Sequence, residues 1–585
     1  MIIEKINSPE DVQALSSEEL KSLSAEIRDC LIRKLSKTGG HLGSNLGMIE
    51  ITVALHKVFH SPVDKILFDV SHQCYTHKIL TGRKQAFLEE AHYHDVSGYS
   101  NPAESVHDFF PIGHTSTAIS LATGMAKVRD LQGGKEQIIA VIGDASLDGG
   151  EAFEALNYVA ELDGPIIIVV NDNDMSIPEN YGGLHNLLNR LKAQNGEVEN
   201  NFFKSLGLEY VFVRDGHDID SLTEAFSAAK NSGKSTVIHC CTQKGKGYSF
   251  AEKDREKWHW AKPFSIESGE FLSSVPKENY GALVAEHLLA KMKEDPRVVV
   301  VAASTPLCIG FHEENRKKAG KQYIDVGIAE QNAITMTAAI AKAGGKPVFA
   351  TNSTFYQRAY DQIAQEMCLG KCPATLLLSH ASVWGHTNDT HVGLYDMALL
   401  SSIPNLTYLA PTNLEEYLTI LDWSIEQKES TVAIRIPWTG VYHAEKAVRK
   451  DYSDVEYMVT EQGKEVAILA LGSFYQLGAE VREKLKAAGI HASLINPLYI
   501  NKKDEALLES LKKEHRLVVT LEDGILQGGF GSMISQYYSL DKMKVLNKGF
   551  FKAIPSSYVP EEFMRENRLL PEQITEDIIE LIKEK

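Results

Sequence analysis

The sequence predicts an α/β protein of three doubly wound, mainly parallel domains. Two observations support this fold class. Short runs of β-branched residues recur along the chain, for example at residues 138–141 and 166–170, and such runs are typical of buried parallel strands. Between these two runs, residues 151–162 carry apolar side chains at helical spacing. Strands that alternate with helices in this way indicate parallel sheets covered by helices.

The length of the chain and two charged stretches divide it into domains. A chain of 585 residues is too long for one hydrophobic core. Residues 252–267 and 445–454 are rich in charge and look like linkers. We therefore predict domains at residues 1–265, 278–445 and 455–585. Further strands are expected at residues 298–302, 347–350, 375–378, 406–410, 432–436, 466–471, 492–495 and 517–521.

Composition and charge narrow the class of protein. The chain is 43% hydrophobic and 24% charged, as soluble globular proteins commonly are. Its formal net charge is −18 and no block of basic residues stands out, so we expect neither nucleic acid nor a membrane as a partner. The N-terminus lacks the layout of a signal peptide, and no apolar run reaches the length of a membrane span. We therefore expect a soluble cytoplasmic protein.

The cysteines indicate free thiols. Seven cysteines in so long a chain do not suggest a disulfide framework. Cys368 and Cys372 could share a helix face and bind a metal. The sequence has no matching second pair, so two buried thiols are the better interpretation.

Polar side chains follow the two apolar runs named above. Residues 142–146, Ile-Gly-Asp-Ala-Ser, end the first strand, and residues 171–173, Asn-Asp-Asn, end the second. The spacing between Asp144 and Asn173 accommodates one helix, so both strand ends are expected at the edge where open α/β sheets bind ligands. A carboxylate, a carboxamide oxygen and backbone carbonyls are hard oxygen ligands that hold Mg²⁺ and leave room for a diphosphate. Two ordinary strand ends with polar turns are the alternative.

Together the two segments resemble the diphosphate–metal motif of thiamine-diphosphate enzymes. Ala145 stands where that motif usually has a glycine. Its methyl group is tolerated if the backbone stays at negative φ, but it narrows the approach to the diphosphate.

Five further segments carry a fuller resemblance. They are Gly-Gly-His-Leu-Gly at residues 39–43, Asp-Val-Ser-His-Gln-Cys-Tyr-Thr-His-Lys at 69–78, Gly-His-Thr-Ser-Thr at 113–117, Asp-Val-Gly-Ile-Ala-Glu-Gln at 325–331 and Ser-Thr-Phe-Tyr-Gln-Arg-Ala-Tyr-Asp-Gln at 353–362. In this order they resemble the transketolase superfamily, and most specifically its 1-deoxy-D-xylulose-5-phosphate synthase family. The resemblance covers nearly the whole chain and is weaker after residue 455. It implies two thiamine-diphosphate-binding domains, a transketolase C-terminal-like domain and a homodimer.

The resemblance also implies roles for single side chains. Thiamine diphosphate reacts through a carbanion on its thiazolium ring, and the protein must place a carboxyl group against the pyrimidine ring to generate it. Glu330 resembles the residue in this role, Phe355 the aromatic that stacks on the pyrimidine, and Ile177 the apolar wedge that bends the cofactor. The Mg²⁺ ligands would be Asp144, Asn173 and the backbone carbonyl of Met175. The remaining cofactor-binding residues would be Gly143, Ala145, Ser146 and His259.

Histidines and one arginine are the expected substrate-handling residues. By the same resemblance, Arg358 would help to hold the donor, and the oxygens of donor and acceptor would be managed by His41, His72, His114 and His391. An imidazole can donate a hydrogen bond to a developing alkoxide or carry its proton near neutral pH. For each histidine, a buried side chain with only structural hydrogen bonds is the alternative.

The acceptor side departs from the family pattern. Enzymes of that family bind the phosphate of glyceraldehyde 3-phosphate with arginines and a tyrosine, and bidentate guanidinium contacts suit that dianion. Here His380 and Trp438 stand in place of the arginines, Asn352 in place of the tyrosine, and Thr387 in place of an aspartate that holds a substrate hydroxyl. Each lost charge-assisted hydrogen bond is worth about 1.5–3 kcal/mol. We therefore predict a neutral or differently charged acceptor, unless basic residues of another loop compensate.

These features predict a thiamine-diphosphate- and Mg²⁺-dependent carboligase. It would decarboxylate a 2-oxo acid such as pyruvate and transfer the two-carbon unit to an aldehyde that need not be glyceraldehyde 3-phosphate. Transketolase-like ketol transfer from a ketose stays open, because His380 and Ser382 faintly resemble the His-Asp-Ser of that branch. A non-catalytic cofactor-binding paralogue is the alternative of another class.

Overall fold

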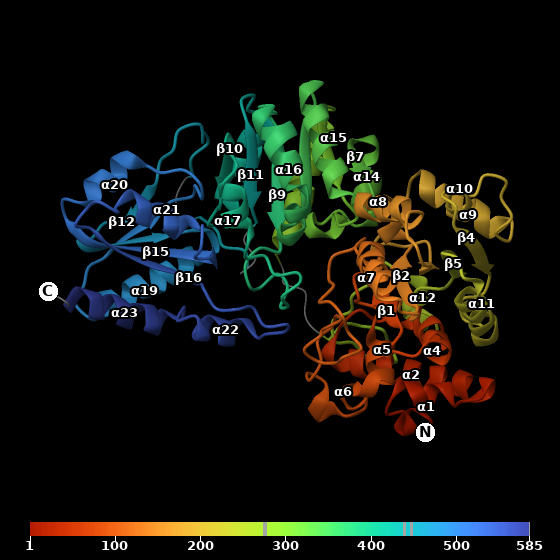
Figure 1. The fold of residues 1–585 in the computed structure, drawn as a ribbon. Helices are drawn as coiled ribbons and strands as arrows, with labels where there is room; N and C mark the ends of the chain where they lie inside the picture. Colours follow the sequence, from red (N-terminus) through yellow and green to blue (C-terminus); the bar gives the residue numbers. More distant parts are fainter. Residues whose placement is uncertain (273–277, 437–439, 445–447, 584–585) are drawn as a thin grey trace. The chain divides into compact units, whose positions relative to one another are not determined.

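The computed structural model describes residues 1–272, 278–436, 440–444 and 448–583 (Figure 1). These residues form two compact units. The first contains residues 1–272 together with Gly327–Ala329, and the second contains the rest of the described chain. No helix in the described ranges combines the length and the apolar character needed to cross a lipid bilayer.

The first unit is built around one sheet of five parallel strands, in the order β1-β2-β3-β5-β4. The strands are β1 (Lys65–Phe68), β2 (Ile138–Gly143), β3 (Ile167–Asp172), β4 (Glu209–Val213) and β5 (Thr236–Cys241). The α-helices are α1 (Pro9–Gln13), α2 (Ser17–Thr38), α3 (Leu42–Leu46), α4 (Ile49–Val58), α5 (Tyr75–Lys78), α6 (Gln85–Leu88), α7 (Ala118–Gln132), α8 (Gly150–Val159), α9 (Gly183–Ala193), α10 (Phe202–Ser205), α11 (Ile219–Ser232) and α12 (Ser249–Lys253).

Both faces of this sheet are buried under helices. Ala140 and Ile168 pack in one apolar cluster with residues of α7, α8 and α9, whereas Val141 and Val169 pack in another with residues of α4 and α11. Successive side chains of a strand point to opposite faces. A strand covered on both faces therefore needs apolar residues at every position, which explains the continuous apolar runs of β2 and β3.

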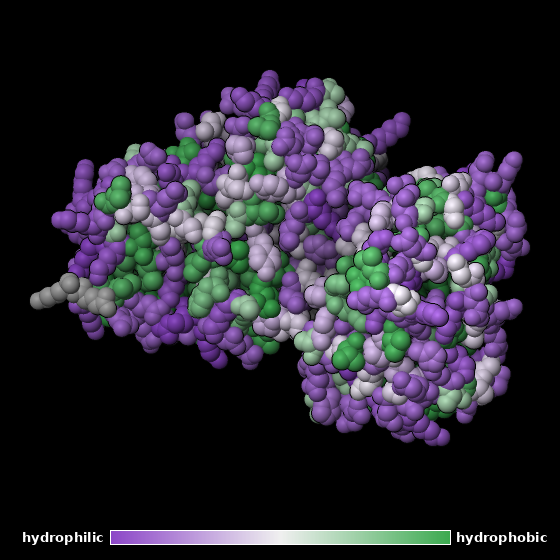
Figure 2. All heavy atoms as spheres, viewed as in Figure 1, coloured by the Kyte–Doolittle hydropathy of each residue, from purple (hydrophilic) through white to green (hydrophobic). Residues whose placement is uncertain are grey.

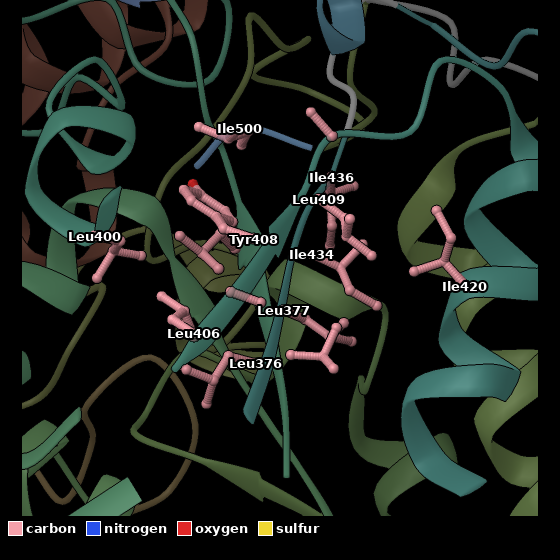
Figure 3. Packing of buried hydrophobic residues seen from close by; sticks show 14 of the residues in the cluster. Leu376, Leu377, Leu400, Leu406, Tyr408, Leu409, Ile420, Ile434, Ile436 and Ile500 are labelled. Atoms are coloured by element: carbon pink, nitrogen blue, oxygen red, sulfur yellow. The ribbon is translucent and has the colours of Figure 1, made fainter. Parts of the chain in front are cut away.

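The second unit contains two sheets. The first has six parallel strands in the order β10-β11-β9-β8-β6-β7. The strands are β6 (Val298–Ala302), β7 (Tyr323–Asp325), β8 (Lys346–Asn352), β9 (Thr375–Ser379), β10 (Leu406–Leu409) and β11 (Thr431–Arg435). The α-helices are α13 (Tyr280–Glu294), α14 (Glu313–Ala319), α15 (Glu330–Lys342), α16 (Tyr360–Gln362), α17 (Asp396–Ser401) and α18 (Leu414–Glu426). Figure 3 shows part of its core, where Leu377 and Ile434 of adjacent strands lie between Leu400 and Ile420 of helices.

The third sheet of the chain has the order β12-β14-β13-β15-β16. Its strands are β12 (Met458–Glu461), β13 (Glu465–Ala470), β14 (Ser493–Asn496), β15 (His515–Ile525) and β16 (Lys544–Phe550). β12 runs antiparallel to β14, and the other pairs are parallel. The α-helices are α19 (Tyr475–Ala487), α20 (Glu505–Leu511), α21 (Phe530–Tyr537), α22 (Pro560–Glu566) and α23 (Pro571–Lys583).

The predicted fold class is confirmed, because all three sheets are mainly parallel and alternate with helices. Each strand range predicted from the sequence overlaps a strand of the structure, and the helix expected at residues 151–162 is α8. The strands of the three sheets fall within the three predicted domains. The domain boundaries themselves stay a prediction.

The thiols and the surface agree with a globular protein. Cys368 and Cys372 are buried and free, and the described residues contain no cluster of three or more His, Cys, Asp or Glu side chains placed to hold a metal. On the face drawn in Figure 2, hydrophilic side chains predominate and hydrophobic ones lie in small separate groups. Scattered apolar groups of this kind are normal for a protein surface.

Candidate active site

Asp144 and Asn173 follow adjacent strands of the first unit. β2 ends at Gly143 and β3 at Asp172, and the two strands pair with Gly143 opposite Asn171. The backbone N–H of Asp144 donates to the carbonyl of Asn171 at 3.1 Å. The structure therefore brings the two polar segments together at one edge of the sheet.

The carboxyl group of Asp144 is buried. Asn180 Nδ2 donates to Asp144 Oδ2 at 2.9 Å. Burial, together with the nearby carboxylate of Asp172, raises the pKa of Asp144 well above its usual range. Asp172 has cationic or donor partners of its own, because His239 Nε2 donates to it at 2.8 Å and Lys192 Nζ at 3.0 Å. Asp144 is thus the acid at this edge that a bound cation would stabilise most.

The residues around Asp144 leave its backbone unstrained. Ala145 begins the short 3-10 segment Ala145–Asp148 and has a negative φ, since the residues of positive φ do not include it. The carbonyl of Ser146 accepts a hydrogen bond from Ser116 Oγ at 2.8 Å. The methyl group of Ala145 is therefore compatible with this turn.

The segment after β3 folds back on itself. The backbone N–H of Met175 donates to Asn173 Oδ1 at 3.2 Å, and Met175 forms an isolated antiparallel bridge with Glu179. Asp174 adopts a left-handed conformation with φ +64°. Ile177 is half-buried in the same turn.

Lys244 is a buried lysine that sequence reasoning missed. It follows β5, and its Nζ donates to the carbonyl of Ser176 at 2.5 Å. Burial lowers the pKa of Lys244 to about 7, and the charge of Asp144 acts on it in the opposite direction. Its position just after a strand could have marked Lys244 in the sequence, because ligands gather at the carboxyl ends of parallel strands.

Three of the predicted histidines meet in the first unit. The ring centroids of His41 and His72 are 4.9 Å apart. The ring centroid of His259 lies 5.6 Å from that of His41 and 5.3 Å from that of His72. His72 and His259 have buried Nδ1 atoms without a hydrogen-bond partner among the described residues. Burial lowers the pKa of His72 to about 3 and that of His259 well below its usual range. Neutral imidazoles with unpaired buried atoms indicate a place for a ligand.

Strained backbone places His72 in this group. Val70 and Ser71 both have positive φ, at 59° and 64°. The carboxylate of Asp69 accepts from the backbone N–H groups of residues 116, 117 and 118 at 2.8–3.0 Å, where the chain enters α7. His114 lies in the loop that enters this helix. Strain of this kind persists where the surrounding structure holds it, and it is common at functional sites.

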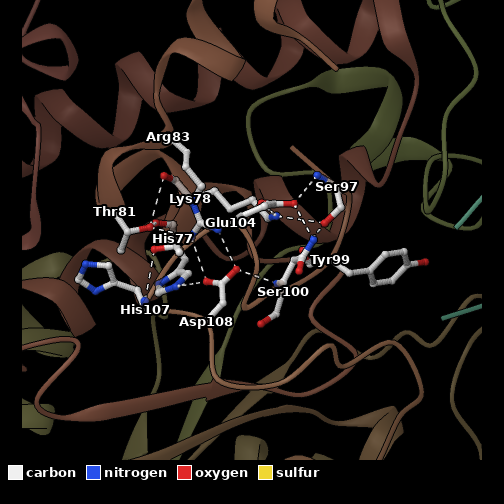
Figure 4. A network of polar contacts seen from close by, with 12 residues as sticks. His77, Lys78, Thr81, Arg83, Ser97, Tyr99, Ser100, Glu104, His107 and Asp108 are labelled. Carbon is white, nitrogen blue, oxygen red and sulfur yellow. Dashed lines mark hydrogen bonds and ion pairs between the residues drawn. The ribbon is translucent and has the colours of Figure 1, made fainter. Parts of the chain in front are cut away.

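A buried polar network anchors the loop between α6 and α7 (Figure 4). Asp108 accepts from Arg83 Nη1 at 2.7 Å and from His77 Nε2 at 3.1 Å. Glu104 accepts from Lys78 Nζ at 2.5 Å. The loop carries Tyr99, whose ring lies 5.7 Å from that of His41, so the network positions one side of the histidine group.

Glu330 begins α15 in the second unit, and its carboxyl group is buried. Its Oε2 has no hydrogen-bond partner among the residues that the structure describes. Burial raises the pKa of Glu330, and the charge of Arg358 acts against this rise. Phe355 lies in the same 3-10 segment as Arg358, and its ring contacts that of His391 edge-on at 5.7 Å. The structure thus brings Glu330 near Arg358, and Phe355 to His391.

The residues of the predicted acceptor side also cluster in the second unit. We call Asn352, Ser379, His380 and His386 the acceptor-side cluster. Ser379 Oγ donates to Asn352 Oδ1 at 3.0 Å and lies 2.9 Å from His380 Nδ1, and Asn352 Nδ2 lies 3.2 Å from His386 Nε2. The rings of His380 and His386 stack at 4.8 Å.

Thr387 directly follows His386 in the chain. Thr387 is exposed, and its carbonyl accepts from the backbone N–H of Tyr558 at 3.3 Å. Trp438 lies outside the described residues. Sequence reasoning did not single out His386, because only the folding of its loop brings it beside His380.

Three sequence models of protein families match the chain in order. The one described as 1-deoxy-D-xylulose-5-phosphate synthase matches residues 3–200 and 192–242. The transketolase pyrimidine binding domain matches residues 277–441, and the transketolase C-terminal domain matches residues 456–574.

Curated relatives match nearly the whole chain. The 1-deoxy-D-xylulose-5-phosphate synthase of Clostridium acetobutylicum is 38% identical in an alignment 591 residues long, gaps included, which covers 94% of this chain and 94% of the relative. That of Clostridium beijerinckii is 39% identical over 573 residues, or 92% of each chain. Among solved structures, transketolase from Campylobacter jejuni aligns over 96% of this chain and 99% of its own, at 18% identity and a TM-score of 0.44, which is too low to carry an argument. The relatives show that the chain belongs to the 1-deoxy-D-xylulose-5-phosphate synthase family of thiamine-diphosphate-dependent transferases, within the transketolase superfamily.

Proposed function

We propose that this chain binds thiamine diphosphate and Mg²⁺ and joins a two-carbon unit from a 2-oxo acid, such as pyruvate, to an aldehyde. The burial of the Glu330 carboxyl group is the observation that carries the proposal. It is a buried carboxyl group with a raised pKa and an Oε2 atom that lacks a partner among the described residues. Such a group can donate a hydrogen bond to a ring nitrogen, as the pyrimidine of this cofactor requires. Phe355 would stack on the same ring.

The diphosphate end of the cofactor fits the first unit. Asp144, Asn173 and the carbonyl of Met175 would hold Mg²⁺, since hard oxygen ligands suit this ion. A divalent cation would stabilise the carboxylate of Asp144, whose pKa is raised by burial. Lys244 would place a second positive charge near the diphosphate. Gly143, Ala145 and Ser146 would line its approach.

The proposed reaction breaks one carbon–carbon bond and forms another. When bound, thiamine diphosphate would supply a nucleophilic carbon and a cationic thiazolium ring that takes up the electron pair released by decarboxylation. The bond between the carboxylate and carbonyl carbons of the 2-oxo acid breaks, and carbon dioxide leaves. The carbonyl carbon then bonds to the aldehyde carbon, and the former aldehyde oxygen takes up one proton.

The histidines would manage these protons. His72 and His259 are neutral because of their burial, so each can accept or donate at Nδ1. By the family resemblance, His41 and His114 of the first unit would also handle protons of the substrate, as would His391 of the second unit, and Arg358 would help to hold the donor.

Carbon dioxide release tests the donor. With thiamine diphosphate and Mg²⁺ present, we expect the protein to release carbon dioxide from pyruvate. Strict dependence on a ketose would support transketolase-like ketol transfer instead. Calorimetry that detects no binding of thiamine diphosphate would support a non-catalytic paralogue.

We further propose that the protein works as a homodimer in the cytoplasm, as its family resemblance implies. Sedimentation equilibrium should give twice the mass of one chain, and fractionation should leave the protein with the cytoplasmic enzymes. A monomer that carries full activity would contradict the first of these proposals.

A further inference from the structure

Hydrogen-bond geometry defines where the protons of the acceptor-side cluster lie. Asn352 Nδ2 can only donate, so His386 Nε2 accepts this bond and His386 carries its proton on Nδ1. The hydroxyl proton of Ser379 goes to Asn352 Oδ1. The bond between Ser379 Oγ and His380 Nδ1 must then be donated by the imidazole. Both rings therefore carry a proton on Nδ1.

The cluster carries no positive charge at neutral pH. Burial lowers the pKa of His386 to about 4. Burial, with His386 close by, lowers that of His380 well below its usual range. The two rings are stacked with an interplanar angle of 20°, and two cations would repel each other in this arrangement. Neutral imidazoles satisfy both the burial and the stacking.

The loop that carries the cluster is strained and held in place. His380 and Ser382 have positive φ, at 52° and 70°. The backbone N–H of Ser382 donates to the carbonyl of Gly393 at 2.7 Å, which closes the loop. A Cβ atom on Gly385 or Gly393 would lie 2.3 or 2.5 Å from the carbonyl oxygen of His380, so only glycine fits at these positions.

Tyr558, which follows β16, holds the loop at a second point. Tyr558 Oη donates to the carbonyl of His386 at 2.9 Å and to that of Val383 at 3.2 Å. Strained backbone that is fastened at several points indicates a preorganised site.

A neutral, preorganised cluster suits an uncharged ligand. Burying a phosphate dianion beside neutral side chains costs a large desolvation free energy unless cations or several backbone N–H groups repay it. The hydroxyl and carbonyl groups of a small aldehyde can pair with imidazole and carboxamide without such a cost. The hydrogen-bond partners described within the cluster are all uncharged side chains.

We infer that the acceptor-side cluster selects an unphosphorylated hydroxyaldehyde as the acceptor. This inference rests on the proposed carboligase function and names the substrate class of that same site. His386 is the main specificity residue, because Asn352 already donates to its Nε2, which leaves its Nδ1–H group to donate to a ligand. Asn352, Ser379 and His380 are positioning residues that fix the proton on His386.

A matched pair of acceptors tests the inference. Glyceraldehyde and glyceraldehyde 3-phosphate differ only in the phosphate group, and both are given to the holoenzyme with saturating pyruvate. We expect kcat/KM to be at least about tenfold higher for glyceraldehyde, which corresponds to about 1.4 kcal/mol of differential binding. A higher kcat/KM for glyceraldehyde 3-phosphate would overturn the inference. That result, with carbon dioxide release intact, would leave the proposed function standing.

Failure of the proposed function has a different signature. If pyruvate releases no carbon dioxide with either aldehyde present, the carboligase proposal fails, and the inference fails with it. Binding of thiamine diphosphate is followed separately by calorimetry, so an unloaded protein is recognised as such.

Variants of His386 separate recognition from folding. His386→Ala should lower kcat/KM for glyceraldehyde by about tenfold, the worth of one hydrogen bond, and should change the value for glyceraldehyde 3-phosphate much less. His386→Asn, which keeps an N–H donor, should recover part of the loss. His312→Ala is the matched control, because His312 is exposed elsewhere in the same unit. Equal losses for both acceptors, without recovery in His386→Asn, would assign His386 a structural role and overturn its role in specificity.

Discussion

Two acidic residues at neighbouring strand ends have opposite surroundings. Asp172 lies between His239 and Lys192, which hold its pKa low although burial acts to raise it. Asp144 has a neutral amide from Asn180 as its partner, and its pKa is raised. The first residue is therefore part of a buried ion pair, and the second is a carboxyl group that a nearby cation would stabilise. The difference explains why one of two adjacent acids would bind the metal.

Substitution of these two acids should separate the two roles. Asp144→Asn should weaken binding of thiamine diphosphate with Mg²⁺ by about tenfold or more, without lowering the free energy of unfolding. Asp172→Asn should lower the free energy of unfolding by about 3 kcal/mol, because it breaks a buried ion pair. Calorimetric titration and urea denaturation measure the two effects. Equal losses of cofactor affinity in both variants would contradict the assignment.

Single residues were predictable where a local pattern marks them. Asp144 and Asn173 directly follow apolar runs, so the sequence alone placed them at strand ends. Lys244 lies three residues beyond β5 in a glycine-rich stretch, and nothing local shows that its side chain is buried. His386 joins His380 only through the closed loop, which is a non-local effect.

At the scale of elements, a strand residue caps a helix in the third sheet's domain. Glu522 of β15 is buried, and it accepts from the backbone N–H groups of Phe530 and Gly531 at 2.7 and 2.9 Å. These groups belong to the first turn of α21, whose N–H groups lack partners within the helix. Burial raises the pKa of Glu522 to about 7, although both hydrogen bonds favour the charged form.

This raised pKa predicts a pH dependence of stability. An unfolded glutamate titrates near 4.5, so between pH 4.5 and about 7 the folded state holds a proton that the unfolded state has lost. The contribution of Glu522 to stability is therefore fully present below pH 4.5. It is lost as the pH rises through about 7, by about 3 kcal/mol in total.

Glu522→Gln should remove that component. The free energy of unfolding, measured in urea at pH 5 and pH 8, should fall less with rising pH in the variant than in the natural protein. The same pH dependence in both proteins would show that Glu522 does not keep its proton in the folded state.

Burial accounts for the visibility of some strands in the sequence, although β5 is buried and was not predicted. β2 and β3 are covered on both faces and read as continuous apolar runs. β12 is an edge strand whose residues are mostly exposed, and β4 is an edge strand that is only partly buried. Neither has the apolar run that identifies a buried strand, and so neither was predicted.

At the scale of the second unit, one buried arginine joins its two sheets. Arg435 at the end of β11 donates from Nε to Asp396 at 2.8 Å and from Nη1 to Asp523 of β15. All three side chains are buried. Removal of the arginine would leave two carboxylates without a cation, which is more costly than the net contribution of an ion pair.

Arg435→Met should therefore lower the free energy of unfolding of the second unit by about 3–5 kcal/mol. Calorimetry should also show the third sheet unfolding at a lower temperature than the six-stranded sheet. Arg482→Met is the control, because Arg482 pairs with exposed carboxylates and its loss should cost about 1 kcal/mol or less. A small effect of both substitutions would mean that apolar packing alone joins the sheets.

The central proposal for the whole molecule is that the buried carboxyl group of Glu330, whose pKa is raised by burial, activates thiamine diphosphate. The most direct measurement is the exchange rate of the thiazolium C2 proton for deuterium in the bound cofactor, followed by NMR in the natural protein and in Glu330→Gln. We predict exchange that is faster than in free thiamine diphosphate by a factor of about 10² or more in the natural protein, and loss of this acceleration in the variant although calorimetry shows the cofactor bound. Equal exchange rates in the two loaded proteins would contradict the account.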